Sequence, residues 1–159
     1  MRHREAREED ISVICGFPTT AEELFHCFPK ADFPLTEAAL RESMAARSDS
    51  TVVELSGHVV GFANFYRWKD GVCAIGNVLT APHARGTGVA SFLIGHMIRL
   101  GSEKHGAHTI TVSCFHTNVA GLLLYPKLGF RPFEIEERKD HRGNRVVLIH
   151  MRMGTGLGC

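Results

Sequence analysis

The chain has 159 residues, enough for one domain with its own core, and it carries 18 Lys plus Arg against 17 Asp plus Glu. This near-neutral balance gives no reason to expect nucleic acid or a membrane surface as a partner, so any basic site has to be local. The five cysteines form no CxxC pair, and no apolar stretch is typical of a signal peptide or a membrane helix. We expect a single domain over residues 1–159 in the reduced cytoplasm. The histidines show no metal-ligand spacing, so no metal is expected.

The first half of the chain predicts one strand, several short helices and a three-stranded meander. A strand near residues 1–6 precedes a helical region over 7–47, which three prolines divide into pieces. Gly57 and the Lys69-Asp70-Gly71 group are typical of tight turns, so the strands on either side of each turn are expected to pair antiparallel. These strands are predicted at 51–55, 58–66 and 72–80.

The second half alternates helices and strands. Helices are expected over about 88–104 and 118–128, and strands over 109–115, 131–137 and 144–153. Because a helix connects strand 72–80 to strand 109–115, these two strands are expected to run parallel. The sequence therefore predicts an α/β (α+β) fold whose mixed, mostly antiparallel sheet has about seven strands and helices on both faces.

The stretch TAPHARGTGVASFLIGHM places Arg85, Gly86 and Gly88 between a strand and an apolar helix. The first N–H groups of a helix have no partners and carry positive potential, and glycines let several of them face one anion. The stretch lacks the lysine of a P-loop and the third small residue of a dinucleotide fingerprint, where Ser91 stands. A phosphate-binding turn is one interpretation, and a turn that merely joins the strand to the helix is the other.

The turn resembles the acetyl-CoA-binding motif of the GNAT superfamily of N-acetyltransferases, Q/R-x-x-G-x-G/A, here with Arg85, Gly88 and Ala90. The resemblance implies that acetyl-CoA is the cosubstrate and that this turn binds its pyrophosphate. The implied contacts are Arg85, Gly86, Thr87, Gly88, Val89, Ala90 and Ser91.

A second segment, NVAGLLLYPKLGF, resembles the family pattern N-x-x-A/G-x-x-x-Y-x-K/R-x-G-F. Seven residues span about two helical turns, so Asn118 and Tyr125 lie on one line with Gly121 near it, which leaves a gap for a thin chain such as pantetheine. Asn118 as a helix cap and Tyr125 as a core residue are the alternative interpretations. Pro126 departs from helical preference and puts the direction of the Tyr125 hydroxyl in doubt.

The resemblance also implies a mechanism. Acetyl-CoA lies where strands 72–80 and 109–115 splay apart, its pantetheine pairs with Val78, Leu79 and Thr80, and a backbone N–H at Leu79 stabilises the oxyanion. A primary amine of a small molecule or peptide attacks the thioester directly in a ternary complex, and Tyr125 protonates the thiolate. Strand 72–80 has no carboxylate to serve as the base.

Several alternatives remain open at this stage. His83 and His116 are candidate bases by residue type, and Cys114 raises a ping-pong route through an acyl-cysteine. The missing carboxylate also suits a non-catalytic acyl-CoA-binding or sensor domain of the same fold, whereas a Rossmann module would need a parallel sheet throughout. Residues 16–35 and the hairpin 138–145 are expected to wall the acceptor side, and the resemblance allows a homodimer.

Overall fold

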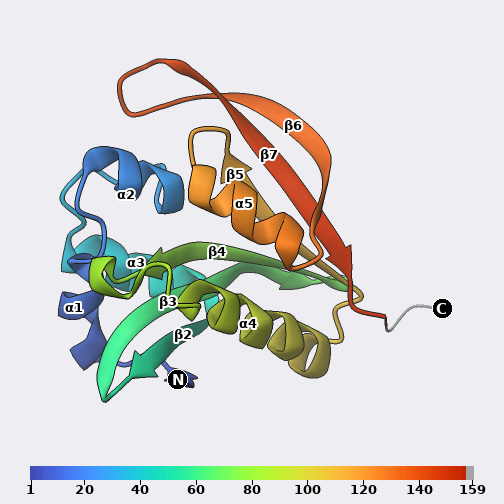
Figure 1. The fold of residues 1–159 in the computed structure, drawn as a ribbon, viewed down its shortest axis with the longest axis horizontal. Coiled ribbons are helices and arrows are strands. Elements are labelled where there is room, and N and C mark those ends of the chain that lie inside the picture. The colour runs from blue at the N-terminus through green and yellow to red at the C-terminus, as the bar shows by residue number, and fades with distance from the viewer. Residues whose placement is uncertain (157–159) are drawn as a thin grey trace.

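The structure, a computed structural model, describes residues 1–156, which contain one seven-stranded sheet in the order β1-β2-β3-β4-β5-β7-β6 (Figure 1). Neighbouring strands pair antiparallel except β4 and β5, which are parallel. This confirms the mixed sheet and excludes the parallel sheet of a Rossmann module. The strands are β1 (Arg2–Glu5), β2 (Ser48–Leu55), β3 (His58–Lys69), β4 (Val72–Thr80), β5 (Thr109–Phe115), β6 (Arg131–Lys139) and β7 (Arg145–Gly154).

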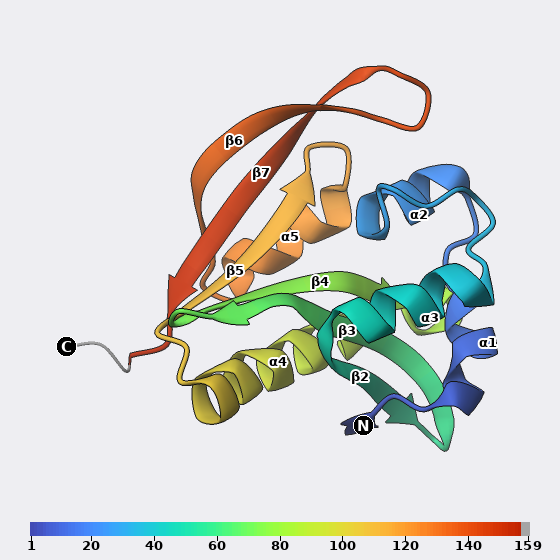
Figure 2. The same cartoon turned by 180° about the vertical axis from the view of Figure 1, so that it is seen from behind.

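Helices cover both faces of the sheet, as the sequence predicts. Figure 1 shows α4 and α5 on one face, and Figure 2 shows α3 on the opposite face with α1 beside it. None of the helices within residues 1–156 combines the length and apolar character needed to cross a membrane. Their bounds are α1 (Ile11–Cys15), α2 (Ala21–Cys27), α3 (Glu37–Ala46), α4 (Val89–His105) and α5 (Val119–Lys127), with 3-10 turns η1 (Glu8–Asp10) and η2 (Pro82–Ala84).

Two tight turns fix the register of the meander. The β2–β3 and β3–β4 loops each contain two residues, and both residues of each loop have positive φ: Ser56 and Gly57 in the first, Asp70 and Gly71 in the second. This is the type I′ pattern, whose twist matches that of the flanking strands. The turn sequences therefore place β4 beside β3, and the predicted bounds of β4 and β5 are confirmed.

The hydrophobic core holds α4 against β3 and β4. Leu93 and Met97 of α4, four residues apart and so on one helical face, are fully buried, as is Phe65 of β3, whose ring packs edge-on against His105 of α4 with the ring centroids 5.8 Å apart. Gly61 provides the close approach, since a Cβ there would lie 2.9 Å from Val89 Cγ1. This packing holds the N-terminus of α4 beside the end of β4.

The parallel pair β4–β5 separates partway along its length. Their register runs only from Val72–Ile75 to Thr109–Val112, although both strands continue beyond these residues. A bulge follows in β4, where Asn77 has a φ of 51° and two β4 residues oppose one β3 residue between the pairs Asn64↔Gly76 and Phe62↔Leu79. The predicted splay is therefore present, and it begins after Ile75 and Val112.

Candidate active site

A cavity of about 1030 Å³ occupies the splay. Its walls come from the outer halves of β4 and β5, the turn that begins α4, the inner side of α5, and the segment around α2, with further residues from β3, β6 and β7. The volume lies at the upper end of the roughly 300–1,000 Å³ of typical small-molecule sites. The lining extends from the α4 turn across β4 and α5 to β7, so an elongated ligand can contact all of these elements.

The turn before α4 presents a row of unpaired backbone donors to this cavity. Within residues 1–156, none of the N–H groups from Gly86 to Ser91 donates to a protein acceptor. Gly86 and Gly88 have φ values of 75° and 89°, in the left-handed region that favours glycine. A Cβ at Gly86 would meet nothing and one at Gly88 would only touch Met1, so the backbone conformation requires the glycines. This geometry suits an anion with several oxygens.

The cavity gathers nearly all the residues that the sequence singled out. Thr87 is the exception: it is not in the cavity wall, and its hydroxyl donates to the Ala84 carbonyl. The predicted residues that line the cavity are Val78, Leu79, Thr80, Arg85, Gly86, Gly88, Val89, Ala90, Ser91, Asn118 and Tyr125. Their contacts with a cofactor stay a prediction.

The side chain of Arg85 is engaged by α2. Its Nη1 donates to Glu23 Oε1 at 2.8 Å and its Nη2 to the Phe17 carbonyl at 3.2 Å. The same ion pair lowers the pKa of Glu23 to about 2. Glu23 also lines the cavity, so an anion bound at the α4 turn competes with Glu23 for the Arg85 guanidinium.

The ladder between β3 and β4 decides which amides face the splay. Ala81 N donates to Val60 O at 2.8 Å, and Leu79 lies opposite Phe62 in the same ladder. Because N–H groups alternate between the two edges of a strand, the Leu79 amide points toward β3 and the amides of Val78 and Thr80 point toward the splay. The oxyanion role expected for Leu79 therefore fits Val78 better.

On α5, Asn118 and Tyr125 both face the cavity. The side-chain Oδ1 of Asn118 accepts from Gly121 N at 3.1 Å, so this residue is a helix cap as well as a wall residue. Pro126 lies inside α5, one residue before its end, and the helix continues to Lys127. Because only Lys127 of the helix follows the proline, little helical structure is lost, and Tyr125 still lines the cavity. Burial raises the pKa of the Tyr125 phenol, which keeps it protonated.

The cysteines near the site are poor nucleophiles. Cys114 is 1% exposed and packs beneath Gly121 of α5, and burial raises the pKa of its thiol to about 12. Burial likewise raises the pKa of Cys27, which lines the cavity, to about 12. Only the thiolate is nucleophilic, so this geometry argues against the acyl-cysteine route.

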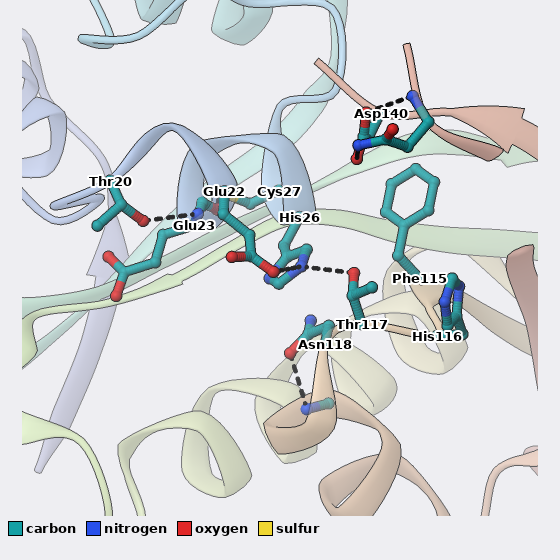
Figure 3. Close-up of polar contacts among 12 residues, drawn as sticks. Thr20, Glu22, Glu23, His26, Cys27, Phe115, His116, Thr117, Asn118 and Asp140 are labelled. Carbon is teal, nitrogen blue, oxygen red and sulfur yellow. Dashed lines mark hydrogen bonds and ion pairs between the residues drawn. The ribbon is translucent and has the colours of Figure 1, made fainter. Parts of the chain in front are cut away.

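Residues from α2 and the β5–α5 loop close the end of the cavity where the acceptor is expected. Figure 3 shows His26 of α2 reaching Thr117 of that loop, with Nε2 and Oγ1 3.0 Å apart, and Glu22 Oε1 lies 3.9 Å from the same Nε2. Burial lowers the pKa of His26. The predicted wall 16–35 thus contributes to the cavity, together with Arg138 of the hairpin.

The histidines proposed from sequence are not in the cavity wall. His83 lies in η2 and His116 follows β5, where its Nδ1 accepts from Val147 N at 2.9 Å. The lining histidines are His26 and His150, and no sequence motif marks either of them. Within residues 1–156, no three His, Cys, Asp or Glu side chains cluster as metal ligands would.

The acetyltransferase (GNAT) family matches residues 17–130, which is more than half of the chain and includes the glycine turn and α5. The chain belongs to this GNAT family. No curated protein matches the chain. The family assignment confirms the resemblance that the two motifs indicated.

Solved structures with the GNAT fold resemble the whole chain. Ribosomal-protein-alanine N-acetyltransferase from Brucella melitensis is 19% identical, with a TM-score of 0.79 and coverage of 97% of this chain and 99% of that one. The Salmonella typhimurium protein yncA, solved with its cofactor acetyl-CoA, is 20% identical, with a TM-score of 0.76 and coverage of 98% and 94%. Ribosomal-protein-S18-alanine N-acetyltransferase from Escherichia coli is 19% identical, with a TM-score of 0.75 and coverage of 97% and 93%. At these identities the likeness shows the fold.

Proposed function

We propose that this protein transfers the acetyl group of acetyl-CoA directly to a primary amine of a small molecule or peptide, in a ternary complex. The observation that carries the proposal is the row of unpaired N–H groups from Gly86 to Ser91, at the N-terminus of α4 and on the wall of a long cavity. Such a row matches a diphosphate. A cytoplasmic location is part of the proposal, supported by the free thiols of Cys15, Cys27, Cys73 and Cys114.

The remaining lining residues have roles in this proposal that follow from their positions. The splay-facing edge of Val78–Thr80 pairs with the amides of the pantetheine arm, and the Val78 N–H stabilises the oxyanion of the tetrahedral intermediate. Tyr125, protonated in its buried position, donates a proton to the leaving thiolate. The acceptor enters from the side of α2 and the β6–β7 hairpin.

The test measures binding and turnover separately. Acetyl-CoA at about 100 times its Kd is expected to stabilise the protein by about 2.7 kcal/mol, which raises Tm by roughly 5–10 °C in a domain of this size. CoA release is then followed over a panel of alkylamines, amino acids and peptide N-termini, with boiled protein as the blank. Saturable turnover on at least one amine supports the proposal.

Two results would contradict it. Saturable acetyl-CoA binding without acetyl transfer to any amine would favour a non-catalytic acyl-CoA sensor. An unchanged Tm in excess acetyl-CoA would remove the role of the glycine turn.

A further inference from the structure

Four polar side chains form a row across the sheet at the base of the splay. Ser113 of β5 places its Oγ 2.7 Å from His150 Nδ1 of β7, and His150 Nε2 lies 3.0 Å from Glu136 Oε1 of β6. The Tyr66 hydroxyl of β3 lies 3.4 Å from the same Ser113 Oγ. Of these residues, Tyr66, Ser113 and His150 line the cavity.

The strand register explains the row. Ser113 lies opposite His150 in the antiparallel β5–β7 ladder, and opposed residues project from the same face of a sheet. Ser113 is also the first β5 residue beyond the paired part of β4–β5. On β4 the equivalent residue is Gly76, where a Cβ would lie 2.7 Å from Tyr66 Cδ1. The absence of a side chain at Gly76 therefore lets Tyr66 cross β4 and reach Ser113.

The row lies on the face opposite Tyr125. Cys114 contacts α5 through Gly121, so Ser113, its neighbour in the strand, projects to the other face. That face carries α3 and leads to the α2 side of the cavity (Figure 2). A group that removes a proton from the amine and a group that gives one to the thiolate thus stand on opposite sides of the splay.

The hydrogen bonds fix the proton positions in the row. The ionised Glu136 carboxylate can only accept, so His150 Nε2 carries a hydrogen; in the tautomer that can act as a base, Nδ1 is then bare. Nδ1 therefore accepts from the Ser113 hydroxyl, whose lone pairs remain for a donor in the cavity. A carboxylate that orients a histidine, which in turn accepts from a hydroxyl, is the arrangement of a general base.

The other candidates for this role are less suitable. Glu23 lines the cavity, but its ion pair with Arg85 holds its pKa at about 2, far below that of an alkylammonium near 10.4. His26 Nε2 is engaged with Thr117, and burial disfavours its charged form. Asn77 has no proton-accepting base, and its side-chain amide makes three hydrogen bonds inside the protein.

We propose that His150 is the general base of the acetyl transfer, acting through the Ser113 hydroxyl, and that Glu136 is a positioning residue for it. This inference rests on the proposed function. The acceptor ammonium gives a proton to Ser113 Oγ while the Ser113 proton moves to His150 Nδ1, which leaves an imidazolium paired with the Glu136 carboxylate. The amine lone pair then attacks the thioester carbon, and the C–S bond breaks with its electrons on sulfur. The second amine proton ends on the CoA thiol, and His150 releases its proton to solvent.

The charged groups around His150 also influence the pH dependence expected for it. Glu134 lies opposite His150 in the β6–β7 register, and Arg138 pairs with Glu136 at 2.8 Å. Arg152, two residues along β7, places its guanidinium 4.8 Å from the Phe133 ring centroid, and that ring lies beside His150. Tyr66 of β3 and Arg47, the residue between α3 and β2 whose guanidinium lies 5.4 Å from the Tyr66 ring centroid, also belong to these groups.

The test compares two acceptors with His150→Gln, Ser113→Ala and Glu136→Gln, and uses His58→Gln, at the exposed first residue of β3, as the matched control. One acceptor is the best alkylamine of the panel, and the other is an alkoxyamine, whose nitrogen is already unprotonated at neutral pH. For the alkylamine we expect His150→Gln to lower kcat/KM about 10²-fold at neutral pH, with the rate recovering as pH rises toward the amine pKa. For the alkoxyamine we expect a loss below about threefold, because no base is needed.

Glu136→Gln is expected to move the acidic limb of the pH profile of kcat/KM to lower pH than in the wild type, because the imidazolium loses its counter-charge.

The outcomes separate this inference from the proposed function. A wild-type protein that acetylates neither acceptor overturns both. A wild-type protein that is active, with a His150→Gln variant that matches it or loses both acceptors equally, overturns the base role alone. Acetyl-Ser113 found by mass spectrometry after acetyl-CoA addition would make Ser113 a nucleophile and also overturn it. If His150→Gln unfolds, the pH profile of Glu136→Gln decides, and an unshifted acidic limb counts against the relay.

Discussion

Asn77 joins three elements to the β4 bulge, and Asn77→Ala tests how much the bulge depends on it. Its Oδ1 accepts from Ser43 Oγ of α3 at 2.8 Å and from Asn64 Nδ2 of β3 at 3.1 Å, and its Nδ2 donates to the Cys27 carbonyl of α2 at 2.8 Å. The side chain is buried and its φ is 51°. Asparagine suits this position because it tolerates the left-handed region better than other non-glycine residues.

The expected loss follows from these contacts. Three buried hydrogen bonds contribute about 1 kcal/mol each, and alanine in the left-handed region costs about 1 kcal/mol more. Asn77→Ala should therefore lower the free energy of unfolding by about 4 kcal/mol, which corresponds to a fall in Tm of roughly 8–16 °C. Urea unfolding measures the loss directly as a lower midpoint at unchanged m.

Asn144→Ala is the matched control. Asn144 is exposed in the β6–β7 hairpin, where its Nδ2 donates to Asp140 Oδ2 at 3.2 Å, and its loss should cost less than about 1 kcal/mol. If Asn77→Ala stays within about 1 kcal/mol of this control, water replaces the three bonds and the bulge does not depend on Asn77.

Three further predictions concern the walls of the cavity. The lowered pKa of Glu23 means that its carboxylate stabilises the fold above pH 4.5 and loses this contribution as pH falls toward about 2, so the urea midpoints of wild type and Glu23→Gln should converge over that range; a constant gap would contradict the ion-pair origin. Gly88→Ala should cost about 1 kcal/mol of stability and raise the Kd for acetyl-CoA about tenfold in calorimetry, whereas Gly95→Ala, in the middle of α4, should change neither adversely. Tyr125→Phe should lower kcat about 10²-fold with an unchanged Kd for acetyl-CoA, and an unchanged kcat would remove its role as the acid.

The sequence predicts most of the fold because turn residues and helix connections, which are local in sequence, determine the strand order. The two-residue turns at Ser56–Gly57 and Asp70–Gly71 set the strand order of the meander, and the helical crossover after Thr80 makes β4 and β5 parallel. Two predicted strand ends were less accurate: β2 begins at Ser48 rather than at residue 51, where no turn residue marks its start, and β3 continues to Lys69, up to the Asp70–Gly71 turn, rather than ending at residue 66. In both cases the strand extends through polar residues, which alternate too weakly to be recognised.

The candidate site was predictable where it is contiguous in sequence and not where strands assemble it. The glycine turn around Gly88 and the segment from Asn118 to Tyr125 are each short and continuous in sequence. The sequence spacing within each segment therefore brings its residues together on one part of the cavity wall. The row from Ser113 to His150 and Glu136 depends on the register of β5, β7 and β6, which no single segment encodes. The ion-pair partner of Arg85 could not be predicted for the same reason, because Glu23 lies 62 residues away in the chain.

The short pairing between β4 and β5 has a mechanical consequence. The sheet consists of two parts that meet over only Val72–Ile75 and Thr109–Val112, and each part has its own helix, α4 on β3 and β4 and α5 on β5 (Figure 1). A small relative rotation about this junction widens or narrows the space between the parts, keeps the packing within each part, and acts on the contacts that cross the splay, which include His26–Thr117 and Tyr66–Ser113. The width of the cavity therefore depends on these side-chain contacts as well as on the sheet, and under the proposed function this would let one backbone accept amines of different bulk and release the larger product.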